Sequence, residues 1–135
     1  MILAKANSSP PIKLAEFLEQ NKKVDKVHYP GLKSNKYHKI ATKQMRGYGG
    51  MFSFEVKGGL KNAKIVLENL NICTLGASLG GVESLIEMPG NTSHMNIPEE
   101  ERKEIGIVPG FVRLSVGIEN VDDLIADFSN ALESN

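Results

Sequence analysis

Two stretches decide the fold class: FVRLSVGI at residues 111–118 and MFSFEVK at residues 51–57. In both, apolar and polar side chains alternate, the pattern of a strand with one buried face and one wet face. The apolar set of the first stretch is Val112, Leu114, Val116 and Ile118, and that of the second is Phe52, Phe54 and Val56. Both stretches therefore predict half-buried strands, whose other face carries Ser53, Glu55, Arg113 and Ser115.

Helix signals surround these two strands. Ser8-Ser9 followed by Pro10-Pro11 predicts a helix over about residues 11–21, because hydroxyls cap free amides and proline suits the first turn. Asn120 predicts the cap of a last helix that begins at Val121, with acidic residues in its first turn. Apolar periodicity or stop signals predict further helices over residues 33–44, 60–69 and 99–104.

Two weaker strands complete the pattern, at residues 24–29, where Pro30-Gly31 ends the stretch, and at residues 84–88. Helices and strands thus alternate along the whole chain. This density of alternation predicts an α/β (α+β) two-layer sandwich, with a small, mainly antiparallel sheet and helices on one face. The polar sheet face could meet solvent or another domain, and the pattern leaves both open.

Length and composition suit one domain spanning residues 1–135. Lys plus Arg (16) balance Asp plus Glu (16), so no overall field favours nucleic acid or an anionic membrane. The single cysteine, Cys73, cannot form an internal disulfide, and no stretch approaches the roughly 20 apolar residues of a membrane span. The start of the sequence shows no signal-peptide pattern. We therefore expect a soluble, cytoplasmic protein with neither nucleic acid nor membrane as partner.

Arg113 is the candidate binding residue, because it is the only charge within residues 111–118. Its planar guanidinium matches the two oxygens of a carboxylate. Charged side chains are also mostly exposed, so a plain surface arginine on a solvated face is the alternative. Spacing alone leaves both interpretations open.

The loop Ser78-Leu79-Gly80-Gly81 is a second candidate, since small residues let a backbone approach a ligand closely. A plain turn is the alternative. The three histidines His28, His38 and His94 are too scattered to suggest a zinc site. Cys73 lies in an apolar stretch, which favours a packed thiol over a nucleophile.

Four segments, in this order, resemble one family: VDKVHYPGL (24–32), QMRGYGGMFSF (44–54), SLGGVESL (78–85) and VRLSVGIE (112–119). They are similar to the C-terminal domain of the pyridoxal-phosphate (PLP) enzymes of Cys/Met metabolism, the cystathionine γ-lyase, cystathionine γ-synthase and methionine γ-lyase group. The resemblance implies the fold of the C-terminal domain of aspartate-aminotransferase-type PLP enzymes. It also implies that Arg113 binds the substrate α-carboxylate, that Ser78 lies beside the substrate and the cofactor-binding lysine, and that Leu79 supplies a backbone contact.

The same resemblance implies that the N-terminal cofactor-binding portion is absent. Ser34-Asn35-Lys36-Tyr37 superficially resembles the surroundings of the Schiff-base lysine, but its neighbours match a later segment, so Lys36 is rejected for that role. We therefore expect no catalytic, cofactor-binding or metal-binding residue in this chain, and PLP bound only by the full-length family. The expected partners are an amino-acid substrate, held by its α-carboxylate, and the N-terminal portion, in a family homotetramer.

The resulting hypothesis is the C-terminal part of a trans-sulfuration enzyme. The complete enzyme would act by γ-elimination or replacement on cystathionine, homocysteine or methionine-type substrates, and this chain alone is expected to be inactive. The alternatives are a non-catalytic binding or protein-interaction domain derived from that family, and a structural subunit that completes an active site on a separate chain. Ala77 occupies a position where some members carry an acid, which leaves lyase versus synthase and the exact substrate open. The oligomeric state, and the choice between fragment, truncated gene product and independent domain, stay open too.

Overall fold

The sheet is the centre of the molecule in the computed structural model, which describes residues 9–135. Its strands are β1 (Val24–His28), β2 (Met51–Val56), β3 (Thr74–Leu75), β4 (Leu85–Glu87) and β5 (Phe111–Ser115). Their order in the sheet is β1-β2-β5-β4-β3. All neighbours are antiparallel except β3 and β4, which are parallel. The predicted small, mainly antiparallel sheet is confirmed.

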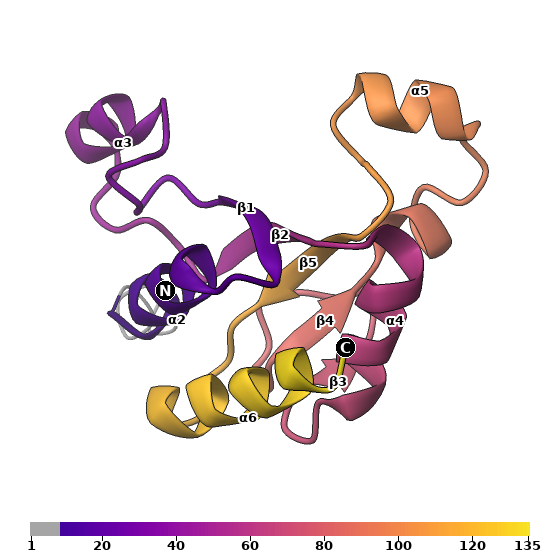
Figure 1. Cartoon of the computed structure of the whole chain (residues 1–135). Coiled ribbons are helices and arrows are strands. Elements are labelled where there is room, and N and C mark those ends of the chain that lie inside the picture. The colour runs from indigo at the N-terminus through magenta and orange to yellow at the C-terminus, as the bar shows by residue number, and fades with distance from the viewer. Residues whose placement is uncertain (1–8) are drawn as a thin grey trace.

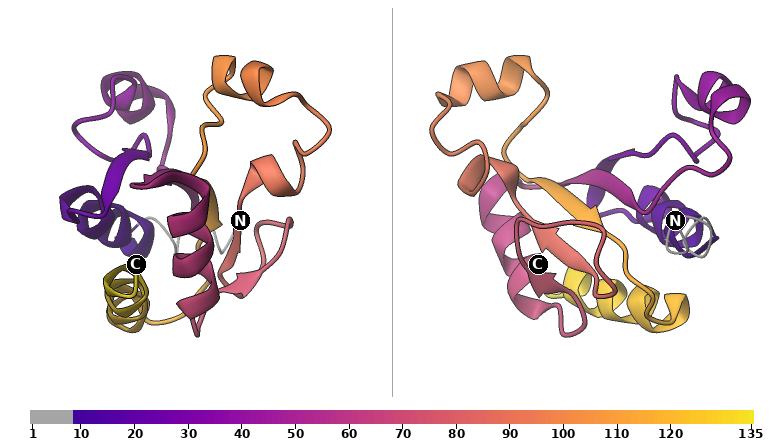
Figure 2. Two further views of the ribbon diagram at one scale, coloured as in Figure 1. Left: turned by 45° about the vertical axis from the view of Figure 1, so that its right-hand side comes forward. Right: turned by 180° about the vertical axis from the view of Figure 1, so that it is seen from behind.

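Three long helices cover one face of this sheet (Figure 1). They are α2 (Ser9–Gln20), α4 (Gly59–Asn69) and α6 (Val121–Glu133). The short helices α3 (His38–Gln44) and α5 (Glu99–Glu104) stand away from the sheet on separate excursions of the chain (Figure 2). A 3₁₀ turn, η1 (Pro89–Asn91), follows β4. The predicted two-layer α/β architecture, with its layer of helices on one sheet face, is therefore confirmed.

The core lies between the sheet and these three helices. Phe54 of β2 and Phe128 of α6 are fully buried and meet edge to face, with ring centroids 6.0 Å apart. Leu114 of β5 and Ile86 of β4 are also fully buried beside them. Burial of each such side chain stabilises the fold by about 1.5–3 kcal/mol. Alternation therefore correctly identified the buried face of β2 and, in β5, the buried side chains of Val112 and Leu114. The prediction was wrong at two positions, because β5 ends at Ser115, which is buried, and Ile118 lies beyond the strand and is 61% exposed.

The last helix begins where the sequence predicted. The Asn120 side chain accepts hydrogen bonds from the backbone amides of Asp122 (2.8 Å) and Asp123 (3.3 Å), so two free amides of the first turn are capped. At the other end of the chain, Ser8 lies outside the described residues. None of the helices in residues 9–135 is long and apolar enough to cross a membrane.

The helix predicted over residues 33–44 is shorter than expected. It begins only at His38, because residues 29–38 form successive turns. The Asn35 side chain accepts a hydrogen bond from the backbone amide of Tyr37 at 2.9 Å, a local contact that competes with helix formation. Only Ala41 of this helix is buried, whereas Ile40 and, at its C-terminal end, Met45 are 53% and 43% exposed.

Candidate functional site

Four polar side chains form a row across the sheet face that the helices leave uncovered. Ser53 of β2 pairs with His28 of β1 on one side and with Arg113 of β5 on the other. Arg113 in turn pairs with Glu87 of β4. Because side chains at paired positions point to the same face, strand register alone places Glu87 beside Arg113.

Two groups anchor the Arg113 guanidinium. Nη2 donates a hydrogen bond to the carbonyl oxygen of Ala77 at 2.8 Å and lies 2.6 Å from Oε1 of Glu87. Ala77 directly precedes Ser78, so the guanidinium lies at the edge of the predicted glycine-rich loop. The side chain of Arg113 remains 23% exposed, and solvent therefore reaches it.

Glu87 is the buried partner of this pair, with only 2% of its side chain exposed. Its Oε2 accepts a hydrogen bond from the hydroxyl of Thr92 at 2.5 Å. Its Oε1 has no hydrogen bond of good angular geometry among the described residues, so the 2.6 Å contact with Arg113 is an ion pair. A buried carboxylate needs such a counter-charge, and Arg113 supplies it.

The loop around Ser78 is held from β5. The backbone amide of Gly80 donates to the Ser115 hydroxyl at 3.0 Å, and Gly80 has φ +75°, a conformation that favours glycine. Ser78 and Leu79 are exposed in this loop. The loop therefore leaves the side chains of Ser78 and Leu79 open to solvent.

A buried network ties the ends of β4 and β5 together behind the loop. Glu119 accepts from the backbone amide of Ser84 (2.7 Å) through Oε1 and from the Ser84 hydroxyl (2.8 Å) through Oε2. The Ser84 hydroxyl in turn accepts from the backbone amide of Gly117 at 2.9 Å. These bonds fix the strand ends that carry Arg113 and the loop.

The chemistry available at this site is anion binding. A guanidinium recognises a carboxylate through paired, charge-assisted hydrogen bonds. Residues 74–92 and 111–119 contain no lysine, so the segments that build the site offer no amine for a Schiff base. These segments therefore do not by themselves fit PLP.

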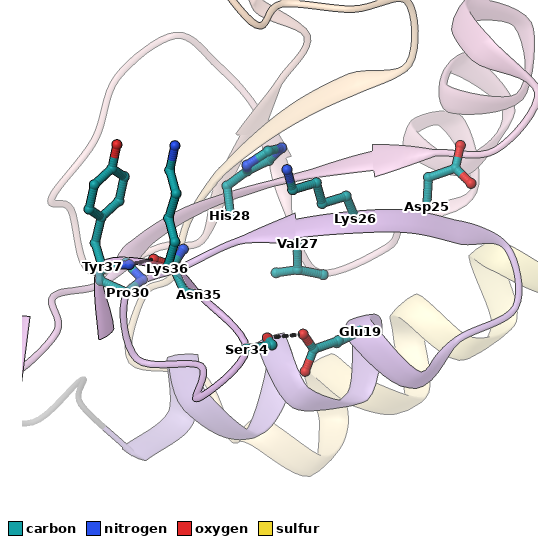
Figure 3. Close-up of a pocket in the computed structure, with 10 residues that line it drawn as sticks. All are labelled: Glu19, Asp25, Lys26, Val27, His28, Pro30, Ser34, Asn35, Lys36 and Tyr37. Carbon is teal, nitrogen blue, oxygen red and sulfur yellow. Dashed lines mark hydrogen bonds between the residues drawn. The ribbon is translucent and has the colours of Figure 1, made fainter. Parts of the chain in front are cut away.

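Lys36 lies elsewhere, in the turn before α3. Its ammonium is 4.8 Å from the centroid of the Tyr37 ring, and it lines an open hollow of about 580 Å³ beside β1 (Figure 3). Arg113, Ser78 and Leu79 are not among the residues that line this hollow. His28, at the β1 end of the polar row, also lines this hollow, but the structure gives no contact between Lys36 and Arg113.

The remaining reactive groups have structural roles. Burial raises the pKa of the Cys73 thiol to about 12, and the charge of Asp127 adds to this effect, so Cys73 is a packed, protonated thiol. Burial also raises the pKa of Tyr29 to about 12, and its hydroxyl donates to the carbonyl oxygen of Gly49 at 2.9 Å. His28 lies 2.7 Å from Glu55 across the strand pair. Within residues 9–135, no three His, Cys, Asp or Glu side chains gather to hold a metal ion.

The structure brings Arg113 next to the predicted loop, with Ala77 as the direct contact. Sequence reasoning missed Glu87 as a member of the site. The sequence of β4 gave no clear signal, because Leu85, an apolar residue, shares the face of Glu87 and all three residues of this strand are buried. Only the pairing of β4 with β5 shows that this acid faces the arginine.

Fold and site together describe a helix-covered α/β domain with a partly exposed arginine on its open sheet face. The chain belongs to the Cys/Met metabolism PLP-dependent enzyme family, whose sequence pattern matches residues 2–133. The resemblance seen in the four sequence segments is thereby confirmed.

Proteins similar to this chain carry the names of enzymes of the same family. The chain is 54% identical to a cystathionine beta-lyase of Lactococcus lactis subsp. cremoris over 129 residues, which is 95% of this chain and 33% of that protein. It is 50% identical to a cystathionine gamma-lyase of Dictyostelium discoideum, with 89% of this chain and 31% of that protein aligned. It is 49% identical to an L-methionine gamma-lyase of Fusobacterium nucleatum subsp. polymorphum, with 90% of this chain and 31% of that protein aligned. The chain spans about a third of the length of these relatives.

Proposed function

We propose that this chain is the C-terminal, carboxylate-binding portion of a PLP-dependent trans-sulfuration enzyme. The complete enzyme would act on cystathionine, homocysteine or methionine-type substrates, in line with the names of the relatives. The observation that carries the proposal is the Arg113 guanidinium, anchored beside the Ser78 loop and open to solvent. We also propose that the complete enzyme is a homotetramer in the cytoplasm.

In this proposal Arg113 binds the α-carboxylate of the substrate. PLP, when bound, accepts electrons from the bond that breaks at the substrate Cα. A carboxylate held at two oxygens fixes the direction of that bond, which lowers the entropic part of the barrier. Ser78 and the backbone of Leu79 would contact the substrate from the loop. Arg113 therefore orients the substrate and moves no proton.

Exposed apolar side chains beside the site support a covering domain. Leu79, Val82 and Ile118 are 55%, 61% and 61% exposed, and the Ile118 amide donates to the Val82 carbonyl oxygen at 2.9 Å, so these last two residues are neighbours. Side chains of this kind at one edge are typical of a surface that meets another polypeptide. The same observation favours the second candidate function, a non-catalytic domain that binds a carboxylate or protein partner through this face.

A chimera tests the proposal. The C-terminal third of the Lactococcus lactis cystathionine beta-lyase would be replaced by this chain, and the kinetics measured with cystathionine. Arg113→Ala should raise KM by roughly 10- to 150-fold, the equivalent of about 1.5–3 kcal/mol for a lost charge-assisted contact. Arg46→Ala, at an exposed arginine in the turn after α3, is the matched control and should leave KM unchanged. Equal KM values for the Arg113 variant and the parent would overturn the clamp role.

The 135-residue chain alone should show no turnover of these substrates and no stoichiometric visible band with PLP, because its site segments lack a lysine. A saturable band that a single Lys→Ala substitution removes, together with keto-acid release, would contradict this expectation. A catalytically silent chimera that still binds carboxylates through Arg113 would favour the second candidate.

A further inference from the structure

Glu87 is a buried acid whose position no feature of the proposed clamp explains. We propose that Glu87 is a positioning residue: it holds the Arg113 guanidinium in one orientation and so makes the site selective for planar carboxylates over spherical anions. This inference rests on the proposed function of Arg113 and adds to it a residue that would touch no substrate.

The geometry fixes one end of the guanidinium. Nη2 lies between Oε1 of Glu87 at 2.6 Å and the carbonyl oxygen of Ala77 at 2.8 Å. The carboxylate itself is held, because Oε2 accepts from the Thr92 hydroxyl at 2.5 Å and the strand pairing sets Glu87 opposite Arg113. Within residues 9–135, the structure gives Nε and Nη1 of Arg113 no comparable partner. These two nitrogens are therefore the ones available to a ligand.

Burial makes this arrangement persistent. The Glu87 side chain is 2% exposed, so its charge cannot leave Arg113 for solvent without a large change in the fold. An incoming carboxylate therefore adds to the pair and does not displace Glu87. The pair has no net charge, which weakens long-range attraction of any anion. Selectivity must then come from the directions of the free N–H groups, which suit two carboxylate oxygens.

Two effects of removing the Glu87 charge oppose each other and can be separated. Without the negative charge of Glu87, Arg113 should bind every monovalent anion more tightly. Without a fixed orientation of the guanidinium, only ligands that need two aligned donors should bind more weakly. The ratio of acetate affinity to chloride affinity cancels the first effect, because both anions carry one charge. A residue that merely stabilises the fold would not change this ratio.

The test uses the 135-residue chain with ¹⁵N-labelled arginine, titrated with acetate or chloride at constant ionic strength. In the parent, Nη1 and Nη2 of Arg113 should give separate signals because rotation of the guanidinium is slow, and acetate should be preferred. In Glu87→Gln the two signals should merge, and the acetate-to-chloride affinity ratio should fall about tenfold. Thr92 is exposed, and Thr92→Val removes the hydroxyl that donates to Oε2 of Glu87. This variant should bring the two signals closer together and lower the acetate-to-chloride ratio, both by less than Glu87→Gln.

The outcomes separate the two proposals. If Arg113→Ala leaves acetate binding unchanged, the proposed function of Arg113 fails. If Arg113→Ala abolishes acetate binding but both Glu87→Gln and Thr92→Val keep the separate signals and the parental ratio, the clamp stands and the positioning role of Glu87 is wrong. Should Glu87→Gln fail to fold, Thr92→Val decides, because an unchanged ratio in that variant refutes the role.

Discussion

Asp127 of α6 connects the helical layer to the segment that leads into the site. Its carboxylate accepts hydrogen bonds from the backbone amide of Asn71 (3.0 Å to each oxygen) and from that of Ile72 (2.9 Å). The side-chain amide of Asn71 adds a fourth contact at 3.2 Å. These bonds fasten the chain as it leaves α4 and enters β3, a few residues before Ser78. We predict that their loss destabilises the whole domain.

The magnitude follows from the number and type of bonds. Hydrogen bonds to a charged group contribute about 1.5–3 kcal/mol each when buried, and unsatisfied donors cost a similar amount. Asn71 is exposed and Ile72 is half-buried, so water can replace part of what is lost. We therefore expect Asp127→Ala to lower the free energy of unfolding by about 3 kcal/mol, and Asp127→Asn by about 2 kcal/mol. The whole free energy of unfolding of a domain of this size is only about 5–15 kcal/mol.

Urea unfolding of the 135-residue chain, followed by circular dichroism, measures this change. Asp123→Asn is the matched control, because Asp123 is an exposed acid of the same helix and should contribute only about 0.5 kcal/mol through the helix dipole. The amides of Asn71 and Ile72 should also exchange with solvent faster in Asp127→Ala. The reasoning is wrong if Asp127→Ala unfolds at the same urea concentration as Asp123→Asn.

Two further predictions concern stability. Burial raises the pKa of Cys73 to about 12 from 9.0, so the unfolded chain loses the thiol proton first as pH rises above 9. The stability that this group contributes is thus complete well below pH 9 and falls as the pH rises above 9, by about 1 kcal/mol between pH 8 and pH 10. Gly117→Ala should lower the free energy of unfolding by about 1–3 kcal/mol, because an added Cβ would lie 2.3 Å from the carbonyl oxygen of Val82.

Each of these predictions has its own control. Cys73→Ala removes the thiol, so the difference between its pH dependence and that of the parent isolates this group, and two parallel profiles would refute the assignment. Gly81→Ala is the control for Gly117, since its nearest non-adjacent atom is 4.0 Å from the added Cβ. If the two alanine variants unfold at the same urea concentration, the added Cβ at Gly117 does not destabilise the fold and the prediction is wrong.

Short-range patterns predicted much of the fold. Alternation identified β2 and β5 and their buried faces, and an asparagine before an acidic first turn located the start of α6. These elements depend on interactions between residues a few positions apart, which the sequence shows directly. The turn-rich stretch before α3 was predicted less well, because the side chain of Asn35 competes with the helix that residues 33–37 were expected to form.

The site itself was only half predictable. Arg113 stood out as the one charge of its strand, and the family resemblance added the Ser78 loop. The contact of Arg113 with Ala77 joins residues 36 positions apart, and the bond between Gly80 and Ser115 spans 35. Neither contact has a local signature. Both depend on the neighbours that β5 acquires in the sheet.

The sequence by itself determined the family, the helix-covered α/β class and the polar face on which Arg113 lies. Only the tertiary structure decided that Glu87 is the buried counter-charge of that arginine and that one end of its guanidinium is already fixed. The physical reason is strand register. Which residues of β4 and β5 face each other depends on the burial of the entire core, and a shift by one residue would turn Glu87 to the opposite face.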